Sequence, residues 1–272
     1  MLEFRKQNLS ETFSVYFDIR MLKILLLGAI QGFPWVLIGS SLSLWLKEDG
    51  LDRSTIGWAG LIFGVYAFNY LWAPLIDRIH IPFLTKKIGH RRAWIVSMQI
   101  IILSSLVLWS MLNPSESLAL VISVGLLIAI ASATQDITVD ALRIEQIGEQ
   151  EGKSMAAGAA MVVVGWWTGY KLGGVISLFT ADILENSGFQ NYWQLTFLIL
   201  GTLIILMNIG LMFVNEPINN DRDAIQKNND DLISNKLGKG NIFSKSLAWI
   251  SGTISGPIIS FFKKNGFSIA IG

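Results

Sequence analysis

Six apolar stretches, each long enough to cross a lipid bilayer, constrain this chain more than any other feature of its sequence. A helix that spans a bilayer needs about 20 mostly apolar residues. The stretches are roughly Leu22 to Leu46, Ile56 to Ile76, Ala93 to Leu112, Leu118 to Ala141, Met155 to Thr180 and Trp193 to Val214. Because backbone polar groups in lipid must be paired within the segment, we predict an all-α integral membrane protein with six spans.

The composition agrees with a membrane location and excludes several classes of function. Of the 272 residues, 52% are hydrophobic and 15% are charged, and the mean hydropathy is +0.51. The 21 basic and 20 acidic side chains nearly cancel, so net charge does not indicate a nucleic-acid partner. The chain has no Cys, and His80 and His90 lie in one basic loop without further ligands at metal-binding spacing. No nucleophile, metal-ligand set or phosphate loop appears at workable spacing, so we expect neither an enzyme nor a cofactor.

The connections between the stretches predict the orientation and the domain boundaries. Basic residues concentrate in alternate connections, which places the N-terminus in the cytoplasm. No signal-peptide cleavage site follows the first apolar run, so we expect that run to be retained as a span. The predicted parts are a cytoplasmic segment at 1–20, a transmembrane bundle at 21–214, a polar linker at 215–240, an interfacial helix at 241–264 and the truncated start of a seventh span at 265–272.

The fourth stretch ends in an ionic segment, Ala131 to Glu145. Asp136, Asp140 and Arg143 follow at i, i+4 and i+7, so they lie on one face of a helix. Such a face turns toward the protein interior or a water-filled cavity rather than lipid. Asp136 is about 27 Å along the span from its outer end, which favours a cytoplasmic gate over a central binding site. A proton-carrying acid and a structural acid paired to an arginine are both open alternatives.

The loop between the second and third stretches is strongly basic. Asp77 and Arg78 close the second stretch, and Arg91 and Arg92 open the third, after Lys86 and Lys87. These charges can lock a cytoplasmic gate by pairing with Asp136, Asp140 or Glu145. Alternatively, the cations fix topology and meet anionic lipid headgroups.

Two other spans carry candidate substrate-binding residues. The first contains Gln31 between Gly28 and Gly32, and a buried amide needs an internal partner or a polar ligand. The fifth contains Lys171, about 24 Å into the span, where it either binds an anionic solute in a central cavity or snorkels to the outer surface. Aromatic residues beside Lys171 can stack on a sugar or face lipid; they are Trp166, Trp167 and Tyr170.

In order and spacing, five motifs over about residues 20 to 214 resemble those of AmpG-type muropeptide permeases, a branch of the major facilitator superfamily. The motifs are GAIQGFP, FNYLWAPLIDR, IGHRR, SATQDITVDALRIE and GYKLGG. The family's polar fourth-span segment falls on Gln135, Asp136, Asp140 and Arg143, and its basic fifth-span position falls on Lys171. Asp77, Arg78, Gly89, Arg91 and Arg92 resemble a degenerate form of the superfamily's cytoplasmic loop motif, lengthened by His80 to Ile88.

The resemblance implies a function and a fold. The function is proton-coupled import of anhydro-muropeptides across the bacterial inner membrane for peptidoglycan recycling. The fold is the N-terminal six-helix bundle of a transporter that pairs two such bundles around a central site. The chain would then be truncated or split, or would associate with a second polypeptide that supplies the C-terminal bundle. A relative that carries an activated anion such as acetyl-CoA, and a membrane fragment without transport activity, are the alternatives.

Overall fold

The computed structural model describes residues 14–148, 151–217, 249 and 253. The chain divides into two units, one of Met1–Asn69 with Ile81–Glu216 and one of Tyr70–His80 with Pro217–Gly272. Most of the predicted linker, the interfacial helix apart from two residues, the start of a seventh span and the first 13 residues lie outside the described part. The domain boundaries therefore stay predictions.

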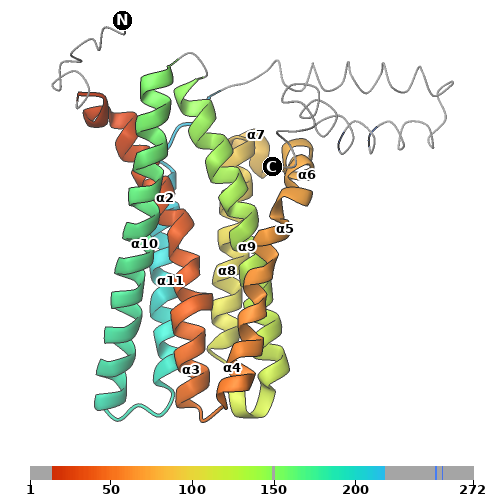
Figure 1. Cartoon of the computed structure of the whole chain (residues 1–272), viewed down its shortest axis with the longest axis vertical. Coiled ribbons are helices and arrows are strands. Elements are labelled where there is room, and N and C mark those ends of the chain that lie inside the picture. Colours follow the sequence, from red (N-terminus) through yellow and green to blue (C-terminus); the bar gives the residue numbers. More distant parts are fainter. Residues whose placement is uncertain (1–13, 149–150, 218–248, 250–252, 254–272) are drawn as a thin grey trace, which may run out of the picture. The chain divides into compact units, whose positions relative to one another are not determined.

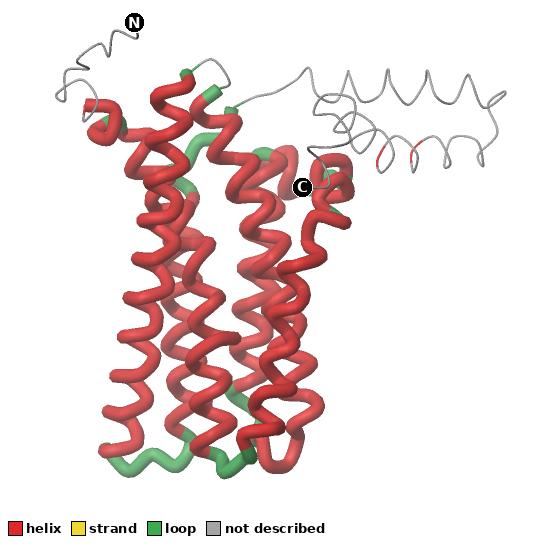
Figure 2. The backbone as a smooth tube through the Cα atoms, in the orientation of Figure 1, coloured by secondary structure: helices red, strands yellow, loops and turns green. Residues whose placement is uncertain are grey.

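The first unit is a bundle of long helices that lie side by side (Figure 1). Five helical segments in the described residues are long and apolar enough to cross a membrane. They are Ile19–Glu48 (α2, η2 and α3), His90–Trp109 (α8), Pro114–Ile147 (α9), Gly152–Asn186 (α10) and Tyr192–Leu211 (α11). Figure 2 shows loops mainly at the two ends of these helices, and the described residues contain no strand. The described residues are thus all helical, as predicted, and include five helices that could cross a membrane.

The second apolar stretch does not form one continuous helix. It is a series of short helices, α4 (Arg53–Ala59), η3 (Gly60–Gly64), α5 (Val65–Phe68), η4 (Asn69–Leu71) and α6 (Ala73–Arg78), and the boundary between the two units falls within η4. Three glycines, Gly57, Gly60 and Gly64, weaken the helix, because each costs about 1 kcal/mol relative to Ala. The predicted count of six spans is therefore not confirmed.

The first span changes its helical geometry after a proline. The side chain of Asp18 caps the start of α2 (Ile19–Val36) by accepting a hydrogen bond from Arg20 N at 2.8 Å. Pro34 lies inside α2 and has no N–H to donate to the carbonyl of Ile30, four residues earlier. A wider π turn, η2 (Leu37–Ser41), follows before α3 (Leu42–Glu48). Such turns are frequent at functional sites.

Glycines allow α2 and α10 to pack with their backbones in contact. A Cβ atom at Gly28 would collide with the carbonyl of Val162, and one at Gly32 would collide with the carbonyl of Trp166. The reverse holds for Gly165 on α10, whose Cβ would meet the carbonyl of Leu25. Small residues permit this close approach between membrane helices. This close packing against α10 fixes the orientation of α2, and with it the positions of Gln31 and Trp35.

Four aromatic side chains fill the core where α3, α8 and α11 meet, and we call them the buried cluster: Trp45, Trp109, Trp193 and Phe197. Each is at most 2% exposed. The ring centroid of Trp109 lies 5.0 Å from that of Phe197 and 5.9 Å from that of Trp45. Two shorter helices also belong to the first unit, η1 (Val15–Phe17) before α2 and α7 (Leu84–Ile88) before α8.

Candidate functional site

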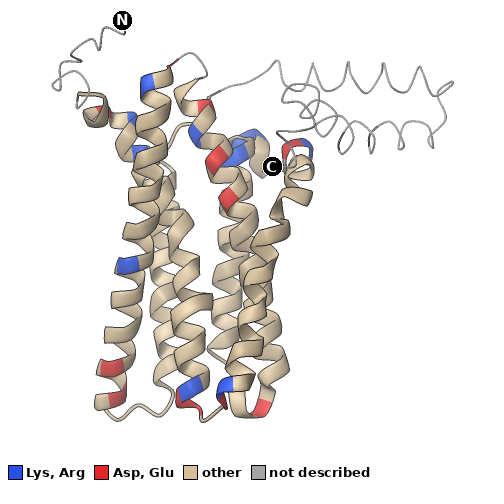
Figure 3. Cartoon of the chain, in the orientation of Figure 1, with Lys and Arg blue, Asp and Glu red and all other residues tan. Residues whose placement is uncertain are grey.

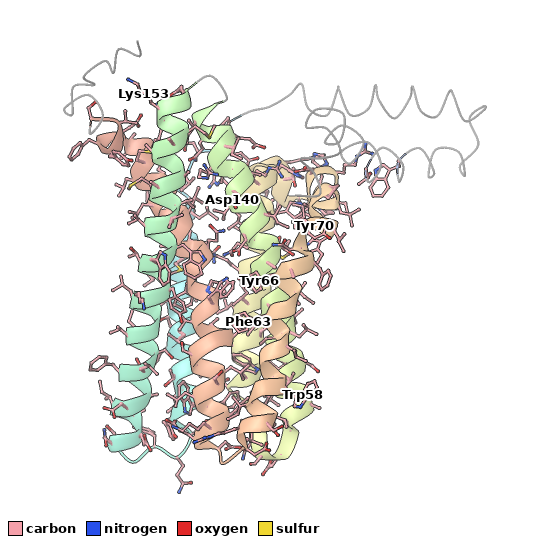
Figure 4. All side chains as sticks on the ribbon, in the orientation of Figure 1. Trp58, Phe63, Tyr66, Tyr70, Asp140 and Lys153 are labelled. Atoms are coloured by element: carbon pink, nitrogen blue, oxygen red, sulfur yellow. The ribbon has the colours of Figure 1, made fainter. Side chains whose placement is uncertain are left out.

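A second group of aromatic residues comes from α2, η3, α5 and α10, and we call it the half-buried cluster: Trp35, Phe63, Tyr66, Trp166 and Tyr170. All five are partly exposed. Trp35 is at the centre, with ring centroids of Tyr66 at 4.5 Å, Phe63 at 5.0 Å and Trp166 at 5.5 Å. Trp166 in turn stacks on Tyr170 at 5.5 Å. Figure 4 shows Phe63 and Tyr66 about halfway along the bundle.

Polar atoms of α9 face this cluster. The Asp136 carboxyl lies beside the side chains of Gln31 and Trp35, and the Ser132 hydroxyl lies beside Tyr66. Nevertheless, four of the polar atoms in this group are buried without a well-formed hydrogen bond: Trp35 Nε1, Tyr66 Oη, Ser132 Oγ and Asp136 Oδ1. An unpaired buried polar atom costs about 1–3 kcal/mol, so this concentration marks a place that can accept polar partners.

Gln135 has a partner that the sequence did not reveal. Its Nε2 donates to the carbonyl of Ile30 at 2.8 Å, and its side chain is completely buried. This is the carbonyl that Pro34 leaves without an N–H partner in α2. Gln135 Oε1 has no hydrogen-bond partner. The Gln135 amide therefore connects the fourth span to the first by a hydrogen bond, and its oxygen can still accept a hydrogen bond.

Asp140 and Arg143 are closer to the end of α9. Arg143 Nε lies 3.7 Å from Asp140 Oδ1, which is an ion pair but too long for a hydrogen bond, and the Asp140 side chain is 51% exposed. No ion pair to Asp136 occurs among the described residues. The helix continues to Ile147, beyond the predicted end at Ala141, so both carboxylates lie farther inside it than expected. In Figure 4, Asp140 lies closer than Tyr66 to the end of the bundle that carries Lys153.

Lys171 lies near the middle of α10 (Gly152–Asn186) and is exposed. Its Nζ is 5.5 Å from the ring centroid of Trp167 and 5.7 Å from that of Tyr170, so the cation rests on two aromatic faces. Because Tyr170 also stacks on Trp166, aromatic contacts connect Lys171 with the half-buried cluster. This places three predicted binding residues together, namely Trp166, Tyr170 and Lys171.

Most Lys, Arg, Asp and Glu residues lie toward the two ends of the long helices (Figure 3). At the basic end, where α2 begins and α9 ends, Arg91 Nε and Nη2 donate to Glu145 Oε1 at 3.1 and 3.0 Å. The Arg91 side chain is only 1% exposed. Of the three acids predicted to pair with this loop, Glu145 is the one that the structure pairs with Arg91.

Glu216 is a functional candidate that sequence reasoning missed. Its two carboxylate oxygens accept from the backbone N–H groups of Arg91 and Arg92, both at 2.9 Å. A carboxylate is favourable at the start of a helix, where N–H groups are unpaired. Gly89 has a φ of +97°, and a Cβ there would collide with this carboxylate. In the sequence, the signal for this candidate was an acid placed just after the last predicted span, which ends at Val214.

A further ion pair joins α2 and α10 at the basic end. Arg20 donates to both oxygens of Glu151, at 2.9 and 3.1 Å, and to Asp18 at 2.8 Å. These hydrogen bonds lower the pKa of Asp18 and that of Glu151. Arg20 therefore ties the start of α2 to the start of α10.

Asp77 and Arg78, both predicted gating residues, belong to α6 in the second unit. Within that unit Arg78 Nη1 donates to the carbonyl of Trp249 at 3.2 Å, and its guanidinium lies 5.9 Å from the centroid of that indole ring. The gating role predicted for Asp77 and Arg78 stays a prediction.

The opposite end of the bundle has a polar cavity of about 230 Å³. Glu48 Oε2 accepts from Trp193 Nε1 at 2.6 Å and from the Tyr192 hydroxyl at 3.0 Å. Asp49 accepts from the backbone N–H of Ser115 at 2.6 Å. These carboxylates are thus occupied in fastening α3, α9 and α11 to one another. Among the described residues, no group of three His, Asp or Glu side chains could hold a metal ion.

Comparison with known proteins identifies the family. The Major Facilitator Superfamily model matches residues 24–270. The chain belongs to this superfamily. A Rickettsia conorii protein that carries the name AmpG 4 is 33% identical over 257 residues, which cover 94% of this chain and 55% of that protein. The anhydromuropeptide permease of Escherichia coli K12 is 29% identical over 241 residues, which cover 89% of this chain and 46% of the permease.

These matches confirm the predicted resemblance to AmpG-type transporters. They also agree with a multi-pass membrane protein in a family of transporters rather than of enzymes. The chain spans about half the length of these relatives. No solved structure matches.

Proposed function

We propose that this chain forms one bundle of a proton-coupled importer of anhydro-muropeptides in the bacterial inner membrane, with its N-terminus in the cytoplasm. The half-buried cluster carries the proposal, because its ring faces lie about halfway along the bundle (Figure 4), beside the Asp136 carboxyl and other polar atoms without well-formed hydrogen bonds. A mid-membrane site of this kind suits a transporter that alternates its access to the two sides. The name of the Escherichia coli relative supplies the solute.

The site residues divide into two roles in this proposal. Residues that bind the solute come from α2, α9 and α10: Gln31, Gln135, Trp166, Tyr170 and Lys171. Residues that carry the proton or gate the cytoplasmic side are charged: Asp77, Arg78, Arg91, Arg92, Asp136, Asp140 and Arg143. Arg91 supports the gate because its buried ion pair to Glu145 joins the start of α8 to the end of α9. A second bundle, from the same or another polypeptide, completes the solute site.

Complementation tests the proposal. The chain is expressed in a bacterium that lacks its own anhydro-muropeptide permease, insertion is confirmed, and uptake of labelled anhydro-muropeptide is measured. One arm contains the chain alone and a second contains a co-expressed C-terminal bundle from an AmpG-type relative. Uptake in the first arm indicates a homo-oligomer, and uptake only in the second indicates a two-part transporter. Uptake in neither arm, despite insertion, overturns the proposal and favours a chain without transport activity.

The Asp136→Asn variant tests the proton role in whichever arm supports uptake. The amide keeps the size of the side chain and an acceptor oxygen for the solute but cannot release a proton, so solute binding should persist while proton-driven uptake falls about ten-fold or more. Asp182→Asn is the matched control, because Asp182 lies on α10 near the opposite end of the bundle. Normal proton-driven uptake by Asp136→Asn would show that the acid is structural.

A further inference from the structure

Three helices contribute polar atoms that lack a well-formed hydrogen bond at one place in the bundle. Trp35 Nε1 comes from α2, Tyr66 Oη from α5, and Ser132 Oγ and Asp136 Oδ1 from α9. The Ser132 side chain is completely buried. Folded proteins pair the large majority of their buried polar side-chain atoms, with protein groups or ordered water. The four atoms lie beside one another without well-formed hydrogen bonds, Asp136 beside Trp35 and Ser132 beside Tyr66, so the group retains hydrogen-bonding capacity for a polar ligand.

The chemistry of the four atoms restricts what this partner can be. An indole N–H, a phenol and an alcohol can donate hydrogen bonds, and the carboxylate can accept them. No cation is among them, so they do not match an anion. They suit an uncharged group that carries several oxygen or amide substituents.

The neighbouring rings restrict the partner further. Trp35, Phe63 and Trp166 are each partly exposed, whereas the polar atoms of Trp35 and Tyr66 are buried beside them. Figure 4 shows Phe63 and Tyr66 near each other in the middle part of the bundle. Accessible ring faces beside a few converging polar groups are typical of sites for small ligands. A sugar ring has both an apolar C–H face and polar substituents, so it satisfies both parts of this site.

We propose that Trp35, Tyr66, Ser132 and Asp136 form a sugar-binding subsite. The pyranose ring packs on Trp35 and Trp166, Tyr66 and Ser132 donate to its oxygen substituents, and Asp136 accepts from a hydroxyl or an acetamido N–H. This assignment rests on the proposed function, because it names the part of the solute that each region binds. It adds three residues, Trp35, Tyr66 and Ser132, to the site, and it gives Asp136 a second role as a hydrogen-bond acceptor for the solute.

The aromatic contacts to Lys171 separate this subsite from an anionic one. Trp35 meets Trp166 at 5.5 Å between centroids, Trp166 meets Tyr170 at 5.5 Å, and Lys171 Nζ lies 5.7 Å from the Tyr170 centroid. The two polar regions are thus joined by a continuous row of rings. A solute with an uncharged sugar at one end and a peptide carboxylate at the other matches this order.

Binding measurements on the purified 272-residue chain, together with the C-terminal bundle if uptake requires it, test the subsite. Three probes are titrated by calorimetry: N,N′-diacetylchitobiose as a neutral sugar, L-alanyl-D-glutamate as an anionic peptide, and the complete anhydro-muropeptide. Tyr66→Phe and Ser132→Ala each remove one hydroxyl and little else. Each should weaken binding of the sugar and of the muropeptide about ten-fold, and leave binding of the dipeptide unchanged. Tyr70→Phe and Ser123→Ala are matched controls, because Tyr70 is exposed and Ser123 lies on α9 but bonds the carbonyl of Ala119.

Thermal stability separates binding from a structural role. Removing a hydroxyl that has no partner should leave the melting temperature unchanged or raise it, whereas removing a paired hydroxyl lowers it. A lower melting temperature of both variants would therefore overturn the subsite, as would unchanged sugar binding or the absence of sugar binding by the wild-type chain. Uptake of muropeptide without an effect of either variant would reject the subsite and keep the proposed function. If the variants weaken sugar binding but the protein does not take up muropeptide, the proposed function is rejected and the subsite is kept.

Discussion

The buried cluster and the half-buried cluster consist of similar aromatic side chains but differ in how their polar atoms are paired. In the buried cluster, Trp109 Nε1 donates to the carbonyl of Val121 at 3.0 Å and Trp193 Nε1 donates to Glu48 at 2.6 Å. In the half-buried cluster, Trp35 Nε1 and the Tyr66 hydroxyl have no such partner. Exposure differs in the same direction, because the first group is almost fully enclosed and the second is accessible.

This difference separates stability from binding in a chain that is rich in aromatic residues. A paired and enclosed indole contributes packing and leaves nothing for a ligand. An accessible ring with an unpaired polar atom costs stability and keeps the capacity to bind. Aromatic content alone therefore does not locate a site in this protein, whereas the state of the polar atoms does.

The largest expected effect is on the buried cluster. Trp109→Ala should lower the free energy of unfolding by about 3–5 kcal/mol, because it leaves a cavity at a fully enclosed ring and frees the carbonyl of Val121. Trp35→Ala should cost only about 1–2 kcal/mol, since that ring is already partly exposed. Thermal unfolding in detergent and abundance in the membrane measure both. Equal losses for the two variants would remove the distinction between the clusters.

The next effect tests the pairing of Trp193. Glu48→Ala leaves the N–H of Trp193, a residue only 2% exposed, without its acceptor and should cost about 2 kcal/mol. Glu48→Gln keeps an acceptor oxygen and should cost about 0.5 kcal/mol or less. The melting temperatures of the two variants give the comparison. If Glu48→Ala is no less stable than Glu48→Gln, the hydrogen bond does not stabilise the buried cluster.

The long helices were predictable from the sequence because length and hydropathy are local properties. The stretch around α5 shows the limit of that reasoning, since its mean hydropathy suits a span while Gly57, Gly60 and Gly64 favour shorter helical segments. The common face of Asp136 and Asp140 was also predictable, because helical periodicity fixes it.

Pairing between distant residues was not predictable. Arg91 meets Glu145 across 54 positions, and Gln135 meets Ile30 across 105, so each bond depends on how the helices pack. Trp35, Tyr66 and Ser132 resemble ordinary residues of membrane helices in the sequence. Their unpaired atoms become visible only once three helices are brought together, and the roles predicted for the other site residues stay predictions.

A smaller effect tests a paired amide beside the half-buried cluster. Gln135→Leu should cost about 1 kcal/mol, because the carbonyl of Ile30 loses the donor that replaces the missing N–H of Pro34. In a Pro34→Ala background the backbone supplies that donor, so the same substitution should cost almost nothing. A double-mutant cycle on thermal unfolding measures the coupling. Equal costs in both backgrounds would show that Gln135 stabilises the protein in another way.

The smallest expected effect on stability is at Lys171, where the effect on transport should be large. Lys171→Ala removes an exposed cation that rests on Trp167 and Tyr170, a contact worth about 0.5–1 kcal/mol at most. Uptake of labelled anhydro-muropeptide should nevertheless fall about ten-fold, because the proposed partner of the solute carboxylate is lost. Lys153→Ala, an exposed lysine on the same helix, should change neither quantity. Unchanged uptake by Lys171→Ala, with normal membrane abundance, would contradict the proposed binding role of this lysine. The sugar subsite would then be the remaining proposed contact with the solute, because it does not depend on Lys171.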